Sequence, residues 1–475
     1  MKRFFWILIL SLPIGSCTTL NYQINVGQFK EAYQLAKKGE VEKAKTSFEE
    51  LCKQKHKVSC LMINEEVGWY AGLAIMQGAS LDKKAKFVIA SEENDHLEIF
   101  AINKTNGKWI WPDKRLVNRP EYAKSSLIHV EFNNLSKNDD YQLVVSNHRT
   151  ELLDFRNFKT LNSEGSKLSF AVISCMRDDL KSTEDIWMDL ENMTTDVILM
   201  IGDTSYLDIG LRDQVLEMTA KRIWQRHMET RTRLRVFRWK NLVPVFATWD
   251  DHDYGKNNGD KSFSLKEDSE KIFQTFFIPG IDNKYIPHGP GVSFAFKLRG
   301  QNFIFLDNRS FRDGPKNKSG YHFGVKQNQW MGEQLSRDNL NWLISGDQFF
   351  GSYHKFESFQ GQHPEAFKAF LSKLKETRNK YVFLSGDRHL SEVMKIPAGI
   401  LGYSTLEITS SPMHSSVYPG AIEQAKNTYR IHGVDGNWNF VFVTVENKNN
   451  KFYLEYESRG AGNLSFFRDE FEIKL

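Results

Sequence analysis

Several signals that would place this 475-residue chain in a specialised class are missing from its sequence. Its formal net charge is only +4, and no Lys/Arg block is dense enough to indicate a nucleic-acid partner. Charged residues make up 26%, the globular average, so the composition does not indicate disorder. The apolar segment near the N-terminus, Phe4 to Leu12, is too short to span a bilayer as a helix. Because 475 residues are too many for one ordinary domain, we expect two or three globular domains.

What the N-terminus does contain is the pattern of a secretory signal peptide over residues 1–16. Lys2 and Arg3 precede the apolar segment, and small residues follow it up to Cys17. The ending IGSC resembles a bacterial lipobox, which implies cleavage before Cys17 and lipidation of that residue; an ordinary signal peptide cut nearby is the alternative. Thr18 stands where Asp would favour retention at the inner membrane. By this resemblance we expect an exported, lipid-anchored protein of the outer membrane, facing the periplasm or the cell surface.

Cysteine is scarce, and the three that follow Cys17 have different expected roles. Cys52 and Cys60 flank the segment KQKHKVS and could form a disulfide in an oxidising compartment. Cys175 is then left without a partner. It is either a buried small apolar residue or a metal ligand.

The pattern of apolar residues divides the mature chain into three parts. Residues 17–80 are expected to form a helical cap, with helix over 25–78, in which Gly39, Ala44 and Phe48 resemble part of a tetratricopeptide or Sel1-type unit. About one and a half such units are too few for independent stability, so the cap must rest on a neighbour; a protein partner for it is unknown. Residues 81–162 contain short alternating strands typical of a β-sandwich.

Residues 163–475 are expected to form the catalytic domain, with an α/β fold. Short, continuously apolar runs alternate with helical stretches, which indicates buried strands whose two faces are both covered. Ligands bind beyond the carboxyl ends of such strands, so polar residues that follow them should converge. Six runs end in Cys175, Asp203, Asp250/Asp251/His252, Asp307/Arg309, Asp347/Gln348 and Asp387/His389.

A carboxylate at the end of one strand is usually a turn or helix cap. Many carboxylates at one edge repel one another unless cations lie among them, which favours a two-metal site. Cys175, Tyr206 and His389 offer thiolate, phenolate and imidazole, which suit a transition metal. The hard oxygens suit Ca²⁺, Mg²⁺ or Mn²⁺, and one Asp could bridge two ions; these oxygens belong to Asp250, Asp251, Asp387 and Asn257.

The motifs at these strand ends resemble a known family. GDTSY, Gly202 to Tyr206, looks like the GDxxY motif of metallophosphatases. The ordered series SC, GDxxY, WDDH…NN, LDxRS, W…Q and SGDxH resembles the PhoD-like alkaline phosphatases, and LEITSSP, Leu406 to Pro412, resembles the segment that follows. The resemblance covers residues 85–475, including the β-sandwich but not the cap. It implies a metallophosphatase-type β-sheet sandwich flanked by helices.

Carried over by position, the resemblance implies a ligand set for Fe³⁺ and Ca²⁺, with Mn²⁺, Mg²⁺ or Zn²⁺ as alternatives. Asp203 would bridge the two ions. The iron ligands would be Cys175, Asp203, Tyr206 and His389, and the further calcium ligands Asp251 and Asp387. Asp250 can exchange roles with Asp251, because the sequence does not fix which carboxylate points inward.

The resemblance also implies roles for residues that would face the substrate. His252 is expected to act as an acid or charge stabiliser. Arg309 is a candidate for binding a phosphate oxygen, with a structural ion pair as the alternative. The chain departs from common family members at Asp253, where they carry Glu, and at Arg388, where they often carry a small or apolar residue. Substrate specificity is therefore the least transferable property.

The function expected from these residues is hydrolysis of a phosphate ester by a metal-bound hydroxide. One alternative is a phosphodiesterase acting on teichoic acid, phospholipid or nucleic acid with the same metals. A second is a non-catalytic surface lipoprotein that uses the fold for binding; it would be expected to have lost ligands, whereas all matched positions are retained.

Overall fold

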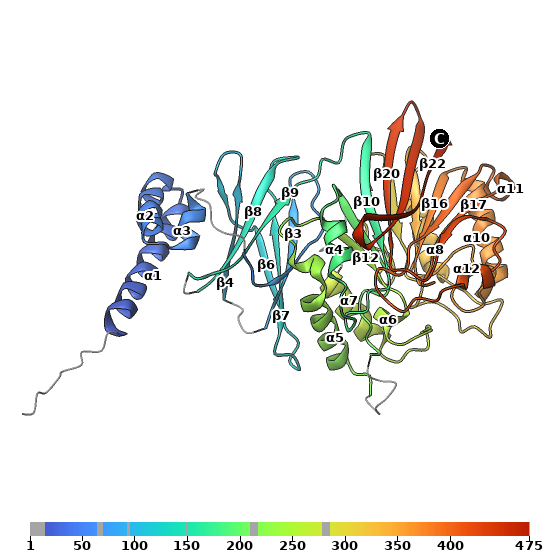
Figure 1. Ribbon diagram of the computed structural model, residues 1–475, viewed down its shortest axis with the longest axis horizontal. Helices are drawn as coiled ribbons and strands as arrows, with labels where there is room; N and C mark the ends of the chain where they lie inside the picture. The colour runs from blue at the N-terminus through green and yellow to red at the C-terminus, as the bar shows by residue number, and fades with distance from the viewer. Residues whose placement is uncertain are drawn as a thin grey trace, which may run out of the picture. The chain divides into compact units, whose positions relative to one another are not determined.

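The computed structural model describes residues 15–63, 70–92, 96–148, 150–209, 217–277 and 286–474 (Figure 1). It divides into two compact units, the first comprising Met1–Tyr70, His96–Trp111 and Tyr141–Arg156, the second the remainder of the chain. Most of the expected signal peptide lies outside the described residues. Cys17 lies within a helix, but its side chain is outside the description. Among the described residues, no helix has the length and apolarity needed to cross a membrane.

The first unit packs three helices on one sheet. The helices are α1 (Gly15–Lys37), α2 (Val41–Lys53) and α3 (Lys57–Met62), and a disulfide joins Cys52 to Cys60. The sheet has the order β1-β9-β8-β4-β5, formed by Tyr70–Ala71, Leu152–Lys159, Asp140–Asn147, Leu97–Asn103 and Trp109–Ile110. Phe48 of α2 contacts Trp109 edge to face in a shared core with Phe100. The helices therefore bury their apolar faces on strands rather than on further helical repeats.

The expected helix over 25–78 is wrong at its C-terminal end. Tyr70–Ala71 forms β1 and Ala74–Gln77 forms β2, in which all four residues are buried. Ala74 pairs with Ala90 in an antiparallel ladder. A short apolar run fits a strand or a helix equally well, and here pairing with a distant strand decides.

Strands are present throughout the segment expected to form a β-sandwich, but they belong to two sheets. β4, β5 and β8 belong to the sheet of the first unit. The second unit contains the four-stranded sheet β2-β3-β7-β6, with β3 at Ala85–Ser91, β7 at Ser126–Phe132 and β6 at Lys114–Asn118. A sandwich of these two sheets, and the domain boundaries, stay predictions.

Two larger sheets dominate the second unit. One has the order β12-β11-β10-β20-β21-β22, formed by Val245–Thr248, Val197–Ile201, Lys167–Ile173, Phe440–Lys448, Lys451–Gly460 and Leu464–Lys474. The other has the order β13-β14-β15-β16-β18-β17-β19, formed by Phe294–Leu298, Gln301–Phe305, Leu340–Ile344, Lys380–Ser385, Thr405–Thr409, Ser391–Ile396 and Arg430–Val434. Within them β10, β11 and β12 are parallel, and so are β14, β15, β16 and β18.

The two large sheets face each other, and helices cover their outer faces. Phe170 of β10 contacts Phe303 and Trp342 of the opposite sheet, with ring centroids 5.5 and 5.1 Å apart. Its neighbours Ala171 and Ile173 point the other way, because successive side chains of a strand alternate between faces. Strands covered on both faces must be apolar throughout, which is the pattern seen in the sequence.

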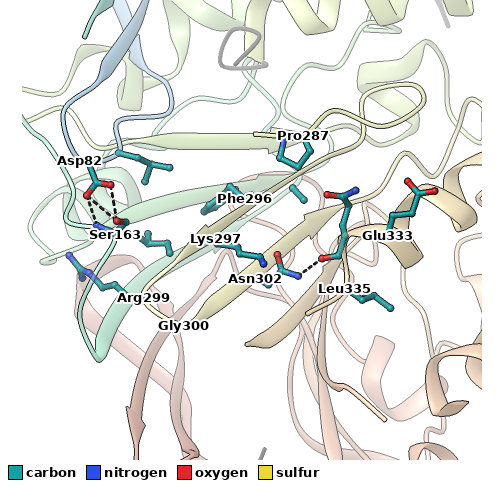
Figure 2. Close-up of a pocket in the computed structure, with 14 residues that line it drawn as sticks. Asp82, Ser163, Pro287, Phe296, Lys297, Arg299, Gly300, Asn302, Glu333 and Leu335 are labelled. Carbon is teal, nitrogen blue, oxygen red and sulfur yellow. Dashed lines mark hydrogen bonds between the residues drawn. The ribbon is translucent and has the colours of Figure 1, made fainter. Parts of the chain in front are cut away.

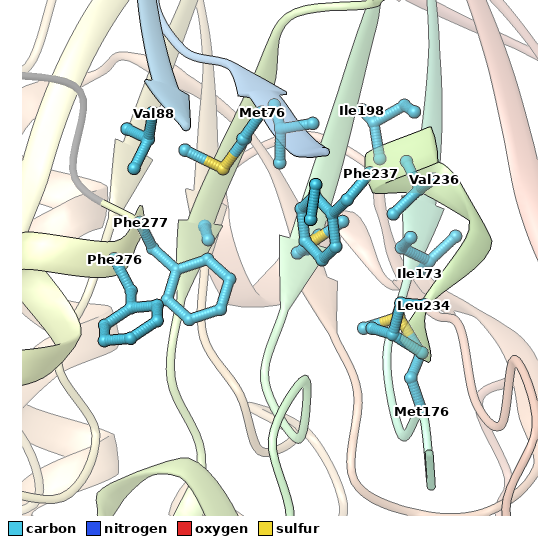
Figure 3. Close-up of a cluster of buried hydrophobic side chains, with 14 of the residues drawn as sticks. Met76, Val88, Ile173, Met176, Ile198, Leu234, Val236, Phe237, Phe276 and Phe277 are labelled. Carbon is cyan, nitrogen blue, oxygen red and sulfur yellow. The ribbon is translucent and has the colours of Figure 1, made fainter. Parts of the chain in front are cut away.

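The outer core of the six-stranded sheet is formed with α4 (Glu184–Glu191), α5 (Ala220–Arg233) and α7 (Lys266–Phe277). Figure 3 shows part of it, with Met76 and Val88 of the four-stranded sheet near Phe276 and Phe277 of α7. On the far side, α8 (Val325–Gln334) and α10 (Pro364–Thr377) pack on the seven-stranded sheet. The carboxyl ends of the parallel strands are thereby held in a rigid frame.

Candidate metal centre

Polar residues follow the parallel strands, as expected. Cys175 follows β10, Asp203 follows β11, and Asp250 follows β12 and caps the short helix α6, Asp251–Tyr254. Asp387 and His389 follow β16 in the other sheet. The residues at these ends therefore come from both large sheets.

Four of these residues have a backbone conformation that side chains disfavour. Cys175, Asp203, Asp387 and His389 have φ of 56°, 53°, 67° and 51°, in the left-handed region. Such residues cost about 1–3 kcal/mol each and persist where the surrounding structure holds them, typically at functional sites. The sequence gives no sign of this conformation.

Close packing fixes Asp250 between two glycines. A Cβ added to Gly202 would lie 2.6 Å from the Asp250 Cβ, and one added to Gly346 would lie 2.7 Å from it. Both glycines precede strand-end aspartates, so their lack of a side chain lets the ends of β11, β12 and β15 approach one another.

The strand ends bring together two groups of possible metal ligands that share one residue. Cys175, Asp203 and His389 form one group, and Asp203, Asp250, Asp251 and Asp387 form the other. Within each group, atoms able to bind a metal lie within 4.8 Å of one another. Asp203 also groups with Asp251 and His252. A carboxylate common to both groups is positioned to bridge two ions.

Three polar atoms of these groups lack the hydrogen-bond partners that burial demands. Asp250 Oδ2, Asp387 Oδ2 and His389 Nδ1 are buried and have no hydrogen-bond partner among the described residues. Burial, and then the charge of Asp387, raise the pKa of Cys175 to about 12. Burial, followed by the charges of Cys175 and Asp251, raises the pKa of Asp203. Cations would supply the missing partners and favour the ionised ligands, so the donor set fits metal binding.

The two adjacent aspartates differ in how they are bonded. Both oxygens of Asp251 accept backbone N–H groups, from His252 at 2.9 Å and Asn258 at 2.6 Å. Asp250 Oδ1 accepts from Asn308 at 2.7 Å and from Arg309, which leaves Oδ2 without a partner. The free oxygen favours Asp250, which the sequence analysis ranked second, as the more available ligand.

Tyr206 lies beside the first group of ligands. Its hydroxyl is 3.1 Å from Ser415 Oγ, and its pKa is raised by burial and then by the charges of Cys175 and Asp203. Its ring stacks on His252 with centroids 4.3 Å apart. The phenol is therefore close to the charges that a metal there would neutralise.

His252 is oriented by Asp208, which the sequence analysis did not identify. Its Nδ1 lies 2.7 Å from Asp208 Oδ1. Burial lowers the pKa of His252, but Asp251 and Asp208 outweigh burial and raise it. The bond to Nδ1 leaves Nε2 as the ring nitrogen available to a substrate.

Arg309 forms the ion pair that was the alternative to phosphate binding. Its side chain has no exposed surface, and its Nε donates to Asp250 Oδ1 at 2.5 Å. Its Nη1 lies 3.8 Å from Asp251. In this conformation the guanidinium holds the two aspartates and does not face solvent.

Two of the six strand ends lie beside the metal-binding groups, as expected, but supply none of the possible ligands. Asp307 accepts the indole N–H of Trp249 and the backbone N–H groups of Arg309 and Ser310. Asp347 pairs with His322 at 3.0 Å and with Arg312 at 3.3 Å. Gln348 donates to Glu392 at 2.6 Å. These three side chains stabilise the loops instead. Asn257, which the sequence analysis counted among the hard oxygens, is exposed.

Other supporting residues were also missed. Ser411 Oγ lies 3.2 Å from Cys175 Sγ and accepts the His389 N–H at 2.9 Å. Asp253 accepts the backbone N–H groups of Ser205 and Thr204, which ties the WDDHD turn to the GDTSY loop. The LEITSSP segment was a signal for Ser411. Asp253 was noted in the sequence only as a departure from common family members, and the fold reveals its role.

Figure 2 shows residues that line a cavity of about 590 Å³. It surrounds the turn from β13 to β14, at the opposite end of β14 from Asp307. Two of its charged groups have hydrogen-bond partners: Asp82 accepts from Ser163, and Arg299 donates to the Asn162 carbonyl. It contains none of the possible metal ligands.

Comparisons with known proteins identify a similar sequence and a solved structure of the same fold. No protein-family model matches the chain. It is 23% identical over 388 residues to alkaline phosphatase D of Bacillus subtilis (strain 168), covering 71% of this chain and 64% of that protein. The chain thus spans just under two thirds of its curated relative. It shares the fold of the solved structure of PhoD, with a TM-score of 0.67, 17% identity, and coverage of 86% of this chain and 91% of that one.

Proposed function

We propose that this chain, whose sequence and fold support a PhoD-like family, is a metal-dependent hydrolase of phosphate esters. The observation that carries the proposal is the pair of ligand groups that share Asp203. Cations bound by these groups would explain why Asp250 Oδ2, Asp387 Oδ2 and His389 Nδ1 are buried without a hydrogen-bond partner among the described residues.

The donor types suggest two different ions. Cys175, His389 and the nearby Tyr206 provide thiolate, imidazole and phenolate, which suit a transition metal, and the family resemblance makes Fe³⁺ the candidate. Asp250, Asp251 and Asp387 provide hard oxygens, which suit Ca²⁺. Metal ions held here would lower the pKa of a bound water and neutralise charge on the phosphoryl oxygens. Mn²⁺, Mg²⁺ and Zn²⁺ are the alternatives.

The chain's own residues would then position the substrate and move a proton. His252, fixed through Nδ1 by Asp208, presents Nε2 to the oxygen of the leaving group. Arg309 acts indirectly by holding Asp250. Export, cleavage before Cys17 and lipid anchoring belong to the same proposal, and rest on the N-terminal sequence alone.

The test is elemental analysis of natively produced protein combined with assays on two nitrophenyl esters. We expect bound iron and calcium, turnover of 4-nitrophenyl phosphate, and loss of turnover after chelation that the two metals reverse. Faster turnover of the bis-ester would favour the phosphodiesterase alternative. A metal-loaded protein inactive on both esters would favour the non-catalytic alternative.

A further inference from the structure

Arg388 is a guanidinium between two of the candidate metal ligands, Asp387 and His389. The Arg388 side chain is 13% exposed, whereas the Arg309 side chain is fully buried. Arg309 is also in ion pairs with Asp250 and Asp251, two of the candidate ligands. Of these two arginines, Arg388 is therefore the one that can meet a substrate without a rearrangement of the ligands.

The guanidinium of Arg388 is held by a segment that follows β15. Its Nη1 donates to Glu357 Oε2 at 2.9 Å, and its central carbon lies 5.6 Å from the centroid of the Tyr353 ring. Tyr353 in turn donates its hydroxyl to Glu392 Oε1 at 2.6 Å, and Glu392 is fully buried. The planar group is thus preorganised, which reduces the entropy lost when it binds a ligand.

One donor of this preorganised group is unused. Arg388 Nε is buried and has no hydrogen-bond partner in the described part of the chain. Buried donors without a partner are rare in general, but this chain has others, Arg430 Nη2 among them, so the position of Arg388 between two candidate ligands is what distinguishes it. The unpartnered atoms of Asp250, Asp387 and His389 are acceptors that suit cations. Arg388 Nε and the two terminal nitrogens of Arg309 are N–H groups instead, which require an acceptor such as an oxygen anion; those of Arg309 lie beside Asp250 and Asp251.

We propose that Arg388 binds a non-reacting oxygen of a phosphomonoester and thereby selects monoesters over diesters. This inference rests on the proposed phosphoesterase function and adds a substrate class to it. A monoester dianion has a further charged oxygen to offer the guanidinium, and a diester carries an esterified oxygen in its place. An alkoxy group is a poor acceptor, and it adds bulk beside Tyr353.

The experiment compares the full-length protein with Arg388→Ala, Arg388→Lys and Arg430→Lys, using 4-nitrophenyl phosphate and bis(4-nitrophenyl) phosphate. Arg430 is the matched control, because its Nε donates to Glu392 in the same network without adjoining a ligand. We expect Arg388→Ala to lower kcat/KM for the monoester about tenfold to a hundredfold, and to change that for the diester less than about threefold. Arg388→Lys should recover part of the monoester activity, and Arg430→Lys should leave the ratio of the two unchanged.

Inhibition by inorganic phosphate gives a second readout that does not require turnover of a diester. Its inhibition constant should rise about tenfold in Arg388→Ala and less in Arg388→Lys. Equal losses with both esters, or a wild-type preference for the diester, would overturn the role of Arg388 and leave the phosphoesterase function standing. A metal-loaded wild-type protein that hydrolyses neither ester would instead overturn the proposed function. If Arg388→Ala does not fold, Arg388→Lys decides, because an unchanged ester ratio in that variant also overturns the inference.

Discussion

At the scale of the residue, the polar neighbours of Cys175 favour the role of a metal ligand over that of a packing residue. The thiol is fully buried, and burial together with Asp387 raises its pKa to about 12. Its sulfur lies 3.5 Å from Asp203 Oδ2 and 3.2 Å from Ser411 Oγ. A cysteine that served only as a small apolar residue would gain nothing from these polar neighbours.

Replacing Cys175 by Ala should therefore remove iron binding and activity together. A ferric thiolate or phenolate absorbs visible light, so we expect the variant to lose colour, iron content and at least about a hundredfold in kcat. A pure packing role would instead cost about 1 kcal/mol of stability and spare the iron. Visible spectra, iron analysis and assay of the same preparation check this. Cys175→Ser, which keeps the size but not the soft ligand, is the control, and a colourless variant with full activity would refute the iron–thiolate assignment.

At the scale of the element, the strands made it possible to predict from the sequence where several of the possible ligands lie. Continuously apolar runs predicted buried parallel strands, so the positions of Asp203, Asp250 and Asp387 at strand ends could be read in advance. The sequence does not predict which strand ends supply possible metal ligands, because that depends on partners distant in sequence. Asp347, for example, forms ion pairs with His322 and Arg312. The left-handed backbone and the β2 strand depend on the same kind of long-range contact.

The approach of β12 to its neighbours gives a prediction at this scale. Gly346→Ala would place a Cβ 2.7 Å from the Asp250 Cβ, which must displace that side chain or the loop after β15. We expect the protein to be destabilised by about 1–3 kcal/mol, as for overpacking elsewhere. We also expect weaker binding of Ca²⁺, for which Asp250 is a proposed ligand. Thermal melts and calcium titration measure the two effects.

Gly332→Ala is the matched control for this substitution. Gly332 lies inside α8, and a Cβ there would meet nothing within 4 Å. Its replacement should stabilise the protein by about 0.5–1 kcal/mol, because alanine is the better helix former. If both variants melt at the same temperature and bind calcium equally, the close packing around Asp250 has no functional consequence.

At the scale of the whole molecule, buried carboxyls should make stability depend on pH. Burial raises the pKa of Asp253 from 3.8 to about 7 and that of Glu407 from 4.5 to about 7. Between the unfolded and folded pKa values the folded state binds more protons, so its stability falls as pH rises through this window. The metal-free protein should melt a few degrees lower at pH 8 than at pH 5.

Metal binding should have the opposite pH dependence, because its ligands compete with protons. The pKa values of Asp203 and Asp387 are raised by burial first, with further contributions from Cys175 and Glu357 respectively, so both carboxyls favour the protonated form in the metal-free protein. Cations bind the ionised form, and their affinity should increase with pH. Removing metals with a chelator should then lower Tm more at pH 8 than at pH 5. Calorimetry of loaded and stripped protein at the two pH values tests this, with Asp387→Asn as the control expected to show a smaller metal-dependent shift at both. A larger loss at pH 5 would mean that the carboxyls do not bind the ions, and that the cluster is structural.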